Sequence, residues 1–307
     1  MKRSTLSLLS LFISICITQP TLAITLPLPH DGGRLIGNNV FYKVENNGGS
    51  LEDIARKFNV GLLALKQANP GVDPFLPRPG SVLTIPGQLL LPDEQREGIV
   101  INLAELRLYF YPPGKNEVTI YPIGIGQLGG TTVTPTMITR VSEKRQNPTW
   151  TPTANIRARY RAMGIELPAV VPAGPDNPMG LYAIRLAAFG GVYLIHGTNA
   201  DFGIGMRVTS GCIRLRDDDI QDLFNRVAIG TRVNIINAPV KIAVEPNGLR
   251  WVEVHQPLSL HIDDDPRTTP IILDEQMGEF KRSVKTDGAG MSRAITYRFG
   301  MPVNVTK

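Results

Sequence analysis

Cysteine is scarce in this sequence of 307 residues, which contains only Cys16 and Cys212. Cys16 lies in an N-terminal leader described below, so Cys212 has no partner in its own chain. This excludes the disulfide framework that is common in exported proteins. Cys212 is therefore an inert buried thiol, a thiol that waits for another chain, or a reactive one, and its surroundings must distinguish these cases.

Long apolar runs are also missing. The apolar stretch at 6–17 is shorter than the about 20 residues that a membrane-spanning helix needs. Two basic residues precede it at 2–3, and a small-residue cleavage site follows at 21–23. This order predicts that residues 1–23 are a cleavable signal peptide and that the mature protein begins near Ile24.

Neither sign of charge is in strong excess. The chain has 32 Lys and Arg against 27 Asp and Glu, a formal net charge of +5. This weakly basic balance is not the footprint of a nucleic-acid-binding protein, so we expect no nucleic acid partner; an anionic wall polymer suits it as well. Glycine and proline are abundant, at 30 and 25 residues, which predicts many turns and short strands.

Residues 40–87 predict a small domain with the order βααβ. A strand-like piece precedes Ser50, which can cap a helix over 51–58, and a second helical pattern at 62–66 stops at Asn69-Pro70. A Pro-Gly turn then leads to a closing strand at 82–85. This segment resembles the LysM module, which binds the glycan strands of peptidoglycan and chitin. The matching positions are Tyr42, Val44, Leu51, Ile54, Ala55, Phe58, Leu65, Asn69, Gly80 and Ile85-Pro86. A packing role without glycan binding stays open.

Residues 97–237 change to a period of two, which predicts half-buried strands and a mainly β domain with a closed or sandwiched sheet. The expected strands are a hairpin within 98–111 that turns at Ala104-Glu105, and 118–125, 137–141, 181–185, 192–195 and 232–236. Between them, the turn-rich loop at 151–180 exceeds the usual length and is expected to form a binding wall. After Cys212 we expect one helix, capped by Asp217 or Asp218 and ended by Gly230.

The last part of the chain, 238–307, predicts a C-terminal accessory subdomain of unknown role. A hairpin is expected at 240–255, because two alternating segments flank Pro246-Asn247-Gly248. The rest of this part has weak periodicity.

The residues around Cys212 favour the reactive thiol. A thiol attacks a carbonyl as the thiolate, so it needs a base, and His196 at the end of an apolar strand is the candidate. The Gly197 carbonyl can orient one imidazole nitrogen, which leaves the other for sulfur. Gly211 permits a tight turn whose backbone N–H groups can stabilise an oxyanion, and Arg214 can bind a substrate carboxylate.

This combination resembles the L,D-transpeptidase (YkuD-domain) family, whose motif pairs an upstream His-Gly with a downstream Ser/Thr-His-Gly-Cys. The matching stretches are His196-Gly197 and Thr209-Ser210-Gly211-Cys212, together with "TWTPT" at 149–153, "PAGPDNPMG" at 172–180, "IHGTN" at 195–199 and "GCIRL" at 211–215. Within the family, the sequence is similar to the ErfK/YbiS/YcfS group of enterobacterial periplasmic enzymes. Ser210 stands where the family has its second histidine, so His196 is expected to be the sole imidazole base. Thr209 and Ser210 are expected to contact substrate.

The resemblance implies a YkuD-type β-sandwich or barrel and a two-step acyl transfer in the periplasm of a Gram-negative bacterium. Cys212 would attack the bond between diaminopimelate and the terminal D-alanine of a peptidoglycan tetrapeptide stem. An amine would resolve the thioester, typically the C-terminal lysine of the Braun lipoprotein. Other members form 3→3 cross-links, and an L,D-carboxypeptidase is a related alternative. Neither a cofactor nor a metal is expected.

Two further hypotheses and several competing interpretations follow. The loop at 151–180 is expected to shield the thioester from water as a lid. A low-pKa, accessible Cys212 in an oxidising compartment is expected to depend on a periplasmic thiol reductase. Papain-like chemistry would pair Cys212 with a later histidine, His255 or His261, whereas sortases share the His-Cys-Arg order at longer spacings. A non-catalytic wall-binding protein, in which the LysM-like domain does all the work, is the alternative of another class.

Overall fold

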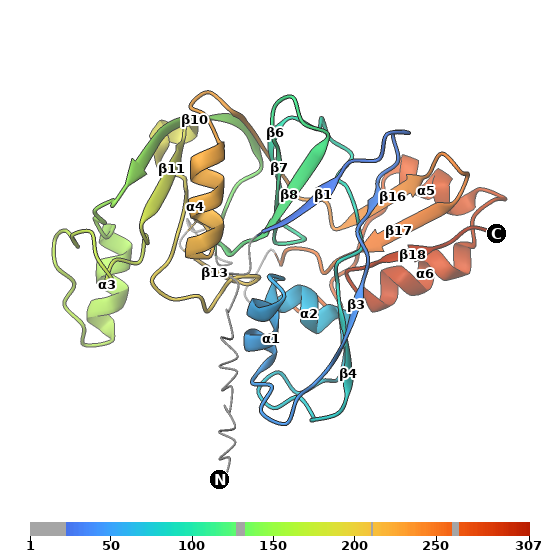
Figure 1. The fold of residues 1–307 in the computed structure, drawn as a ribbon, viewed down its shortest axis with the longest axis horizontal. Helices are drawn as coiled ribbons and strands as arrows, with labels where there is room; N and C mark the ends of the chain where they lie inside the picture. Colours follow the sequence, from blue (N-terminus) through green and yellow to red (C-terminus); the bar gives the residue numbers. More distant parts are fainter. Residues whose placement is uncertain (1–22, 127–132, 210, 260–263) are drawn as a thin grey trace, which may run out of the picture.

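The computed structural model describes residues 23–126, 133–209, 211–259 and 264–307. The protein is mainly β, as expected, and has three parts: a central β domain, a small helical unit against it, and a C-terminal part at one end (Figure 1). The expected signal peptide lies outside the described residues except for Ala23, and so does Ser210. Within the described ranges, no helix is long and apolar enough to cross a membrane.

A nine-stranded sheet forms the central domain. Its order is β1 (Ile24–Pro27), β8 (Glu117–Pro122), β7 (Arg107–Tyr111), β6 (Gly98–Asn102), β15 (Arg232–Ile236), β10 (Met137–Gln146), β11 (Tyr182–Leu186), β12 (Leu194–His196) and β14 (Ile213–Arg214). The β6–β15 and β12–β14 pairs are parallel, and the other neighbours are antiparallel. A separate parallel pair joins β9 (Ile125–Gly126) to β13 (Arg207–Thr209).

The central strands are buried on both faces, which differs from the half-buried strands that we expected. One face packs on Ile220 and Leu223 of α4 (Asp217–Arg226), and the other is covered by Leu28, Leu89 and Leu91 of the N-terminal segment. Every residue of β6 and β7 is consequently buried. Alternate residues of β6 and β7 therefore point into two different cores, rather than into one core and solvent.

Two expectations for the helix after Cys212, its cap and its end, are wrong. Helix α4 begins after Arg216 without a side-chain cap, because the Asp217 carboxylate instead accepts a hydrogen bond from the Thr198 backbone N–H at 3.1 Å. The helix also ends at Arg226, before Gly230. The loop at 151–180 contains α3 (Ala154–Ala162), which Thr153 caps and which has no buried side chain. A short 3₁₀ helix follows at Ala188–Gly191.

The N-terminal unit has the predicted βααβ order. Strands β3 (Val40–Lys43) and β4 (Val82–Ile85) pair antiparallel, with α1 (Leu51–Lys57) and α2 (Leu62–Ala68) between them. Ser50 and Asp53 form a capping box at the start of α1, so two otherwise unpaired backbone donors are satisfied. Strands β2 (Leu35–Ile36) and β5 (Leu89–Leu90) flank the unit as a second short pair.

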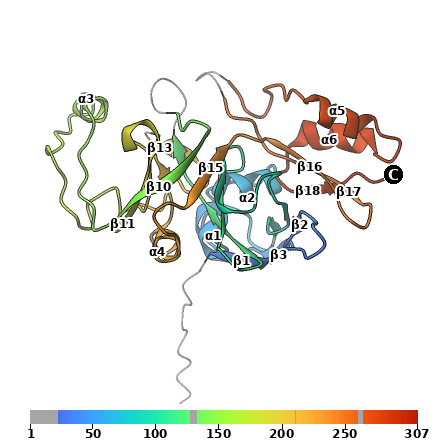
Figure 2. The same ribbon diagram turned by 90° about the horizontal axis from the view of Figure 1, so that it is seen from above.

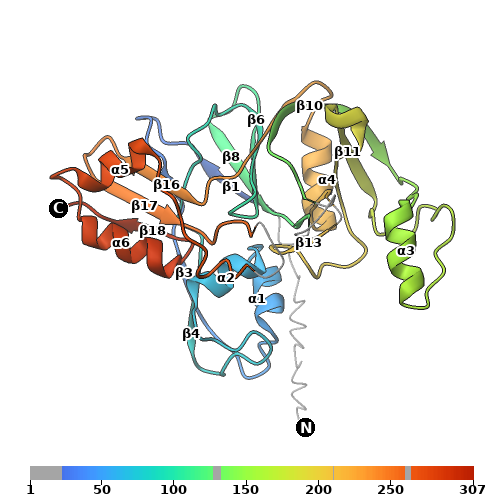
Figure 3. The same cartoon turned by 180° about the vertical axis from the view of Figure 1, so that it is seen from behind.

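The C-terminal part is more regular than its sequence pattern indicates. Strands β16 (Val240–Val244), β17 (Arg250–Val254) and β18 (Pro302–Asn304) form an antiparallel sheet, and the first two are the expected hairpin. Helices α5 (Glu275–Arg282) and α6 (Gly288–Tyr297) pack on this sheet through Phe280 and Met291. Figures 2 and 3 show these helices at the end of the molecule opposite α3.

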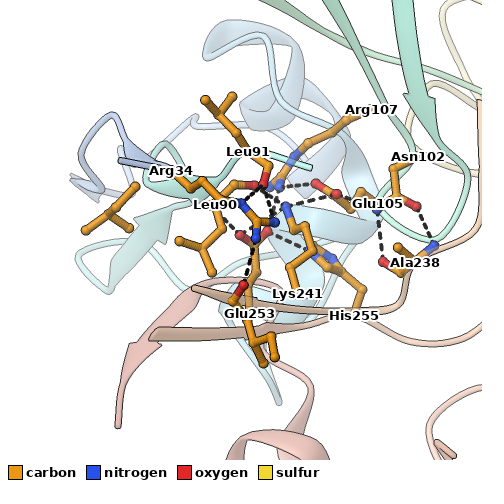
Figure 4. A network of polar contacts seen from close by, with 12 residues as sticks. Arg34, Leu90, Leu91, Asn102, Glu105, Arg107, Ala238, Lys241, Glu253 and His255 are labelled. Atoms are coloured by element: carbon orange, nitrogen blue, oxygen red, sulfur yellow. Dashed lines mark hydrogen bonds and ion pairs between the residues drawn. The ribbon is translucent and has the colours of Figure 1, made fainter. Parts of the chain in front are cut away.

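A buried ion network joins the C-terminal sheet to the nine-stranded central sheet (Figure 4). Arg107 Nη1 lies 3.0 Å from carboxylate oxygens of both Glu105 and Glu253, and Lys241 Nζ lies 2.9 and 3.2 Å from the same two groups. His255 Nε2 is 2.7 Å from Glu253. The two carboxylates and two cations balance, and all five side chains are almost completely buried.

Glu105, Glu253 and His255 bring ligand-type atoms within 4.8 Å of one another. A metal ion there would meet carboxylate oxygens that Arg107 and Lys241 already contact, and it would add positive charge to a neutral cluster. The geometry therefore describes an ion-pair network that fastens one domain to another. Leu90 joins it from the N-terminal segment, since its backbone N–H donates to Glu253 at 2.6 Å.

Candidate active site

His196 and Cys212 enter the same cavity from two adjacent parallel strands. In the pairing of β12 with β14, Ile195 aligns with Ile213 and His196 with Arg214. Aligned residues of neighbouring strands share a face, as do alternate residues of one strand, so His196, Arg214 and Cys212 project to the same side. The cavity has a volume of about 380 Å³. Its lining includes Glu143, Arg145, Trp150, Thr153, Ile156, Met179, Arg185, Val192, Leu194, His196, Thr209, Cys212 and Arg214.

The His196 imidazole is buried and held by its neighbour. Its Nδ1 lies 2.7 Å from the Gly197 carbonyl oxygen, so this nitrogen carries a proton and the other is the acceptor in the neutral ring. Burial, and then the positive charge of Arg214, lower the pKa of His196 to about 4, against the opposing effect of the Gly197 and Met179 carbonyls. The ring is therefore neutral near pH 7 and able to accept a proton.

Cys212 is half-buried at the floor of the cavity, with Sγ 3.9 Å from the Val192 carbonyl oxygen. Burial raises the pKa of the Cys212 thiol, although the Leu194 backbone N–H and the charges of Arg214 and Arg185 act in the opposite direction. The resting sulfur is thus a thiol rather than a thiolate. This corrects the expectation of a low pKa at Cys212.

The turn before Cys212 is fixed by threonine hydroxyls. Gly211 has a φ of +106°, a conformation that favours glycine, and its carbonyl accepts a hydrogen bond from Thr134 Oγ1 at 2.8 Å. Thr209 Oγ1 donates to the Cys212 carbonyl at 2.5 Å. Thr209 lines the cavity, but its hydroxyl proton is engaged by the backbone, so it holds the turn. Ser210 lies outside the described residues.

Arginine side chains make the cavity positively charged. Within the described ranges, the Arg214 guanidinium has no hydrogen-bond or ion-pair partner, and its Nε is buried. Arg185 donates through Nε to Glu143 at 2.9 Å and through Nη1 to the Gly191 carbonyl at 2.6 Å. Arg145 also pairs with Glu143. Three guanidinium groups and one carboxylate thus line the cavity, an excess of positive charge that suits an anionic substrate.

Sequence reasoning did not identify Glu143, Arg145, Arg185 or Trp150. A signal was present for three of them, since Glu143 and Arg145 alternate along β10, and Arg185 shares a face with Ala183, another lining residue. The alternation of residues along β10 and β11 does not show whether this face borders the cavity or is the solvent-exposed face of an edge strand. Their relevance depends on how β10 and β11 align with β12.

The alternative histidine His255 is not near Cys212. It belongs to the buried network with Glu253 and does not line the cavity. A papain-like pairing of Cys212 with His255 is therefore wrong, and His261 lies outside the described residues.

Comparisons with known proteins identify the family of the chain. Family models match the L,D-transpeptidase catalytic domain at residues 96–235, the L,D-transpeptidase C-terminal domain at 239–305 and the LysM domain at 42–86. The chain is 69% identical over 294 residues to the probable L,D-transpeptidase YcfS of Escherichia coli (strain K12), covering 96% of this chain and 92% of that protein. It is 50% identical over 296 residues to the probable L,D-transpeptidase YbiS of the same organism, covering 95% of each.

Among solved structures, the chain is similar to the catalytic domain of an L,D-transpeptidase from E. faecium. The identity is 20% and the TM-score 0.34, over 47% of this chain and 99% of that one. The curated relatives match over nearly the full length. The chain therefore belongs to the L,D-transpeptidase family, a class of enzymes that act on peptidoglycan.

Proposed function

We propose that this protein is a periplasmic L,D-transpeptidase whose nucleophile is Cys212. Its donor substrate is the peptidoglycan tetrapeptide stem, in which Cys212 attacks the amide between diaminopimelate and the terminal D-alanine. D-Alanine leaves, a thioester forms, and an acceptor amine resolves it. The observation that carries the proposal is that His196 and Cys212 line one cavity from paired parallel strands.

In this mechanism, His196 moves the proton in both steps. The neutral imidazole accepts the thiol proton as sulfur attacks, and the resulting imidazolium donates it to the departing D-alanine amine. In the second step, the imidazole takes a proton from the acceptor amine and returns it to the sulfur as the thioester breaks. Exchange of one amide for another conserves bond free energy, so no ATP is needed.

Cationic side chains give the cavity its preference for an acidic peptide. The unpaired Arg214 guanidinium binds a substrate carboxylate, and Arg185 retains N–H groups beyond those used by Glu143 and Gly191. Backbone N–H groups of the Gly211-Cys212 turn stabilise the oxyanion of the tetrahedral intermediate. The Gly197 carbonyl keeps His196 in the tautomer that the reaction needs.

The proposed acceptor is the C-terminal lysine of the Braun lipoprotein, which would become anchored to peptidoglycan. This assignment follows from the resemblance of the sequence to the ErfK/YbiS/YcfS group, and it needs the experiment below. The relatives YcfS and YbiS match over nearly the whole chain, including the LysM, catalytic and C-terminal domains. In the proposed organisation, residues 1–23 are the signal peptide, 40–87 bind glycan, 97–237 catalyse the transfer and 238–307 are accessory. A periplasmic thiol reductase remains a proposed partner, although the raised pKa of Cys212 slows oxidation of the resting enzyme.

The segment at 151–180 is proposed to shield the thioester from water. Residues from both ends of this segment line the cavity: Thr153 and Ile156 near its start, and Pro178 and Met179 near its end. Deletion of residues 154–165 should raise hydrolysis relative to amine transfer, measured as the ratio of tripeptide to cross-linked product. An unchanged ratio refutes this part of the proposal.

A test of the function combines chemistry in vitro with the cell wall in vivo. Purified protein should release D-alanine from labelled tetrapeptide and should gain a covalent carbapenem adduct at Cys212 by intact-protein mass spectrometry. Cys212→Ala should do neither, whereas the exposed-site variant Lys66→Ala should do both. Muropeptide analysis of a deletion strain complemented with each variant identifies the acceptor: lipoprotein-linked muropeptides support our assignment, and loss of 3→3 cross-links alone contradicts it.

A further inference from the structure

The N-terminal βααβ unit, which matches the LysM domain at residues 42–86 and is called the LysM unit below, contacts both segments that flank the Cys212 turn. Its α1–α2 junction lies against residues 201–206, which lead into β13, and against the start of α4. These contacts fix the LysM unit to the catalytic domain, whereas a module that only binds the wall could be joined by a flexible linker.

The first contact is between two backbones. Leu63 N–H donates to the Gly205 carbonyl at 3.1 Å. A Cβ atom at Gly205 would lie 2.3 Å from the Leu62 nitrogen, and one at Gly61 would lie 3.0 Å from the Gly205 Cα atom. Gly205 also has a φ of +76°. The two glycines therefore allow an approach that side chains would prevent.

The second contact is centred on Asn59, which is buried and has a φ of +47°, a region that asparagine tolerates better than most residues. Asn59 Nδ2 donates to Asp219 Oδ1 at 2.9 Å, and Asn59 Oδ1 accepts from Arg216 Nη1 at 2.6 Å. Arg216 Nη2 also donates to the Val60 carbonyl at 3.1 Å. One amide thus bridges a cation and a carboxylate of the catalytic domain.

Both contacts continue directly into the active site. Arg216 follows Leu215, whose backbone N–H donates to the His196 carbonyl at 2.9 Å. On the other side, Gly205 N–H donates to the Ile123 carbonyl at 3.0 Å, and β13 then leads to the turn at Cys212. The backbone before and after Cys212 is therefore held by the LysM unit.

We infer that Asn59 is a positioning residue for Cys212, and that the LysM unit is part of the catalytic scaffold as well as a wall-binding module. This inference rests on the proposed function, because it assigns the consequence of the contact to the transfer reaction. Loss of the Asn59 bridge leaves Arg216 with the Val60 carbonyl alone and frees Asp219, so Cys212 loses its alignment with His196. Arg145 and Arg185 lie on β10 and β11, away from this segment, and stay in place to hold the substrate. The reaction rate falls, and substrate affinity does not.

The test uses the full-length protein and Asn59→Gly, which allows the positive φ and removes only the side-chain bridge. We expect kcat for D-alanine release to fall about tenfold or more while KM changes less than about twofold. The pH profile for alkylation of Cys212 by iodoacetamide should shift toward higher pH. Lys66→Ala, an exposed change on α2, should leave both readouts unchanged.

A rescue experiment separates positioning from general destabilisation. Asn59→Asp alone sets a second carboxylate against Asp219 and should be slow. Combined with Asp219→Asn, it restores both contacts: the carboxylate at position 59 still accepts from Arg216, and donor and acceptor are exchanged between positions 59 and 219, so kcat should recover. Wild-type kcat and alkylation in folded Asn59→Gly, or no recovery in the double variant, overturns the inference. If wild-type protein releases no D-alanine, the proposed function fails, and the alkylation profile still decides the positioning role.

Discussion

The buried network at the junction of the catalytic and C-terminal domains allows a quantitative prediction for Glu253→Gln. Glu253 contacts Arg107, Lys241 and His255, and accepts a hydrogen bond from the Leu90 backbone. Although burial alone raises the pKa of Glu253, Lys241, His255 and Arg107 hold it well below its usual range. The carboxylate is therefore charged at neutral pH, and its contribution to stability is lost only as the pH falls through that lowered pKa.

Replacement by glutamine leaves two buried cations facing Glu105 alone. Breaking a buried ion pair in this way costs about 3–5 kcal/mol. At about 2–4 °C per kcal/mol for a unit of this size, Tm should fall by about 6–20 °C. Lys241→Met added to Glu253→Gln restores the balance of charge, and it should recover part of the loss because Arg107 then pairs with Glu105.

The assay is urea and thermal unfolding followed by circular dichroism at pH 7. Glu279→Gln, an exposed change on α5, is the matched control and should stay within about 0.5 kcal/mol of the wild type. A Glu253→Gln protein as stable as this control would refute the reasoning. So would a double variant less stable than Glu253→Gln, because it would show that net charge does not govern the network.

Three further predictions concern the active site and the LysM contact. Activity should fall as the pH drops through about 4, where His196 becomes protonated, and His196→Ala should lose at least about 100-fold in D-alanine release; a flat pH–rate profile to pH 3 contradicts this. Arg185→Met should raise KM about 10–100-fold, whereas Arg159→Met on the exposed face of α3 should not, and equal KM values count against a carboxylate contact. Burial, the largest effect, raises the pKa of Asp219 to about 7, so its contribution to stability is full at low pH and is lost as the pH rises through 7. Asp219→Asn should reduce the difference in Tm between about pH 5 and pH 8.

Much of the site could be predicted because its determinants are local. His196 and Gly197 are adjacent, and their contact needs only the end of a strand and a carbonyl. The pairing of His196 with a cysteine sixteen residues later was predicted from the strand end and the glycine-rich surroundings, and the family resemblance agreed with it. The structure adds the parallel register that sets both on one face. The βααβ order was readable for the same reason, since helical spacing and turn residues lie within short segments.

The rest depends on partners that are distant in sequence. Glu253 and Arg107 are 146 positions apart in the sequence. The residue pattern of neither strand indicates that these two side chains come into contact. The prediction that Asp217 caps α4 was wrong because its carboxylate accepts a hydrogen bond from the Thr198 backbone N–H instead. Helix α3 escaped prediction because it has no apolar face, so hydrophobic periodicity gives no signal.

The weak attachment of helix α3 affects access to the cavity that contains Cys212. A helix of nine residues without a buried side chain is held by its cap and a few polar contacts, and isolated helices of this length are marginal in water. Its local unfolding therefore costs far less free energy than opening the nine-stranded sheet. Local unfolding of α3 would open the part of the cavity that Ile156 lines, while the strands that hold the sulfur and the imidazole remain intact.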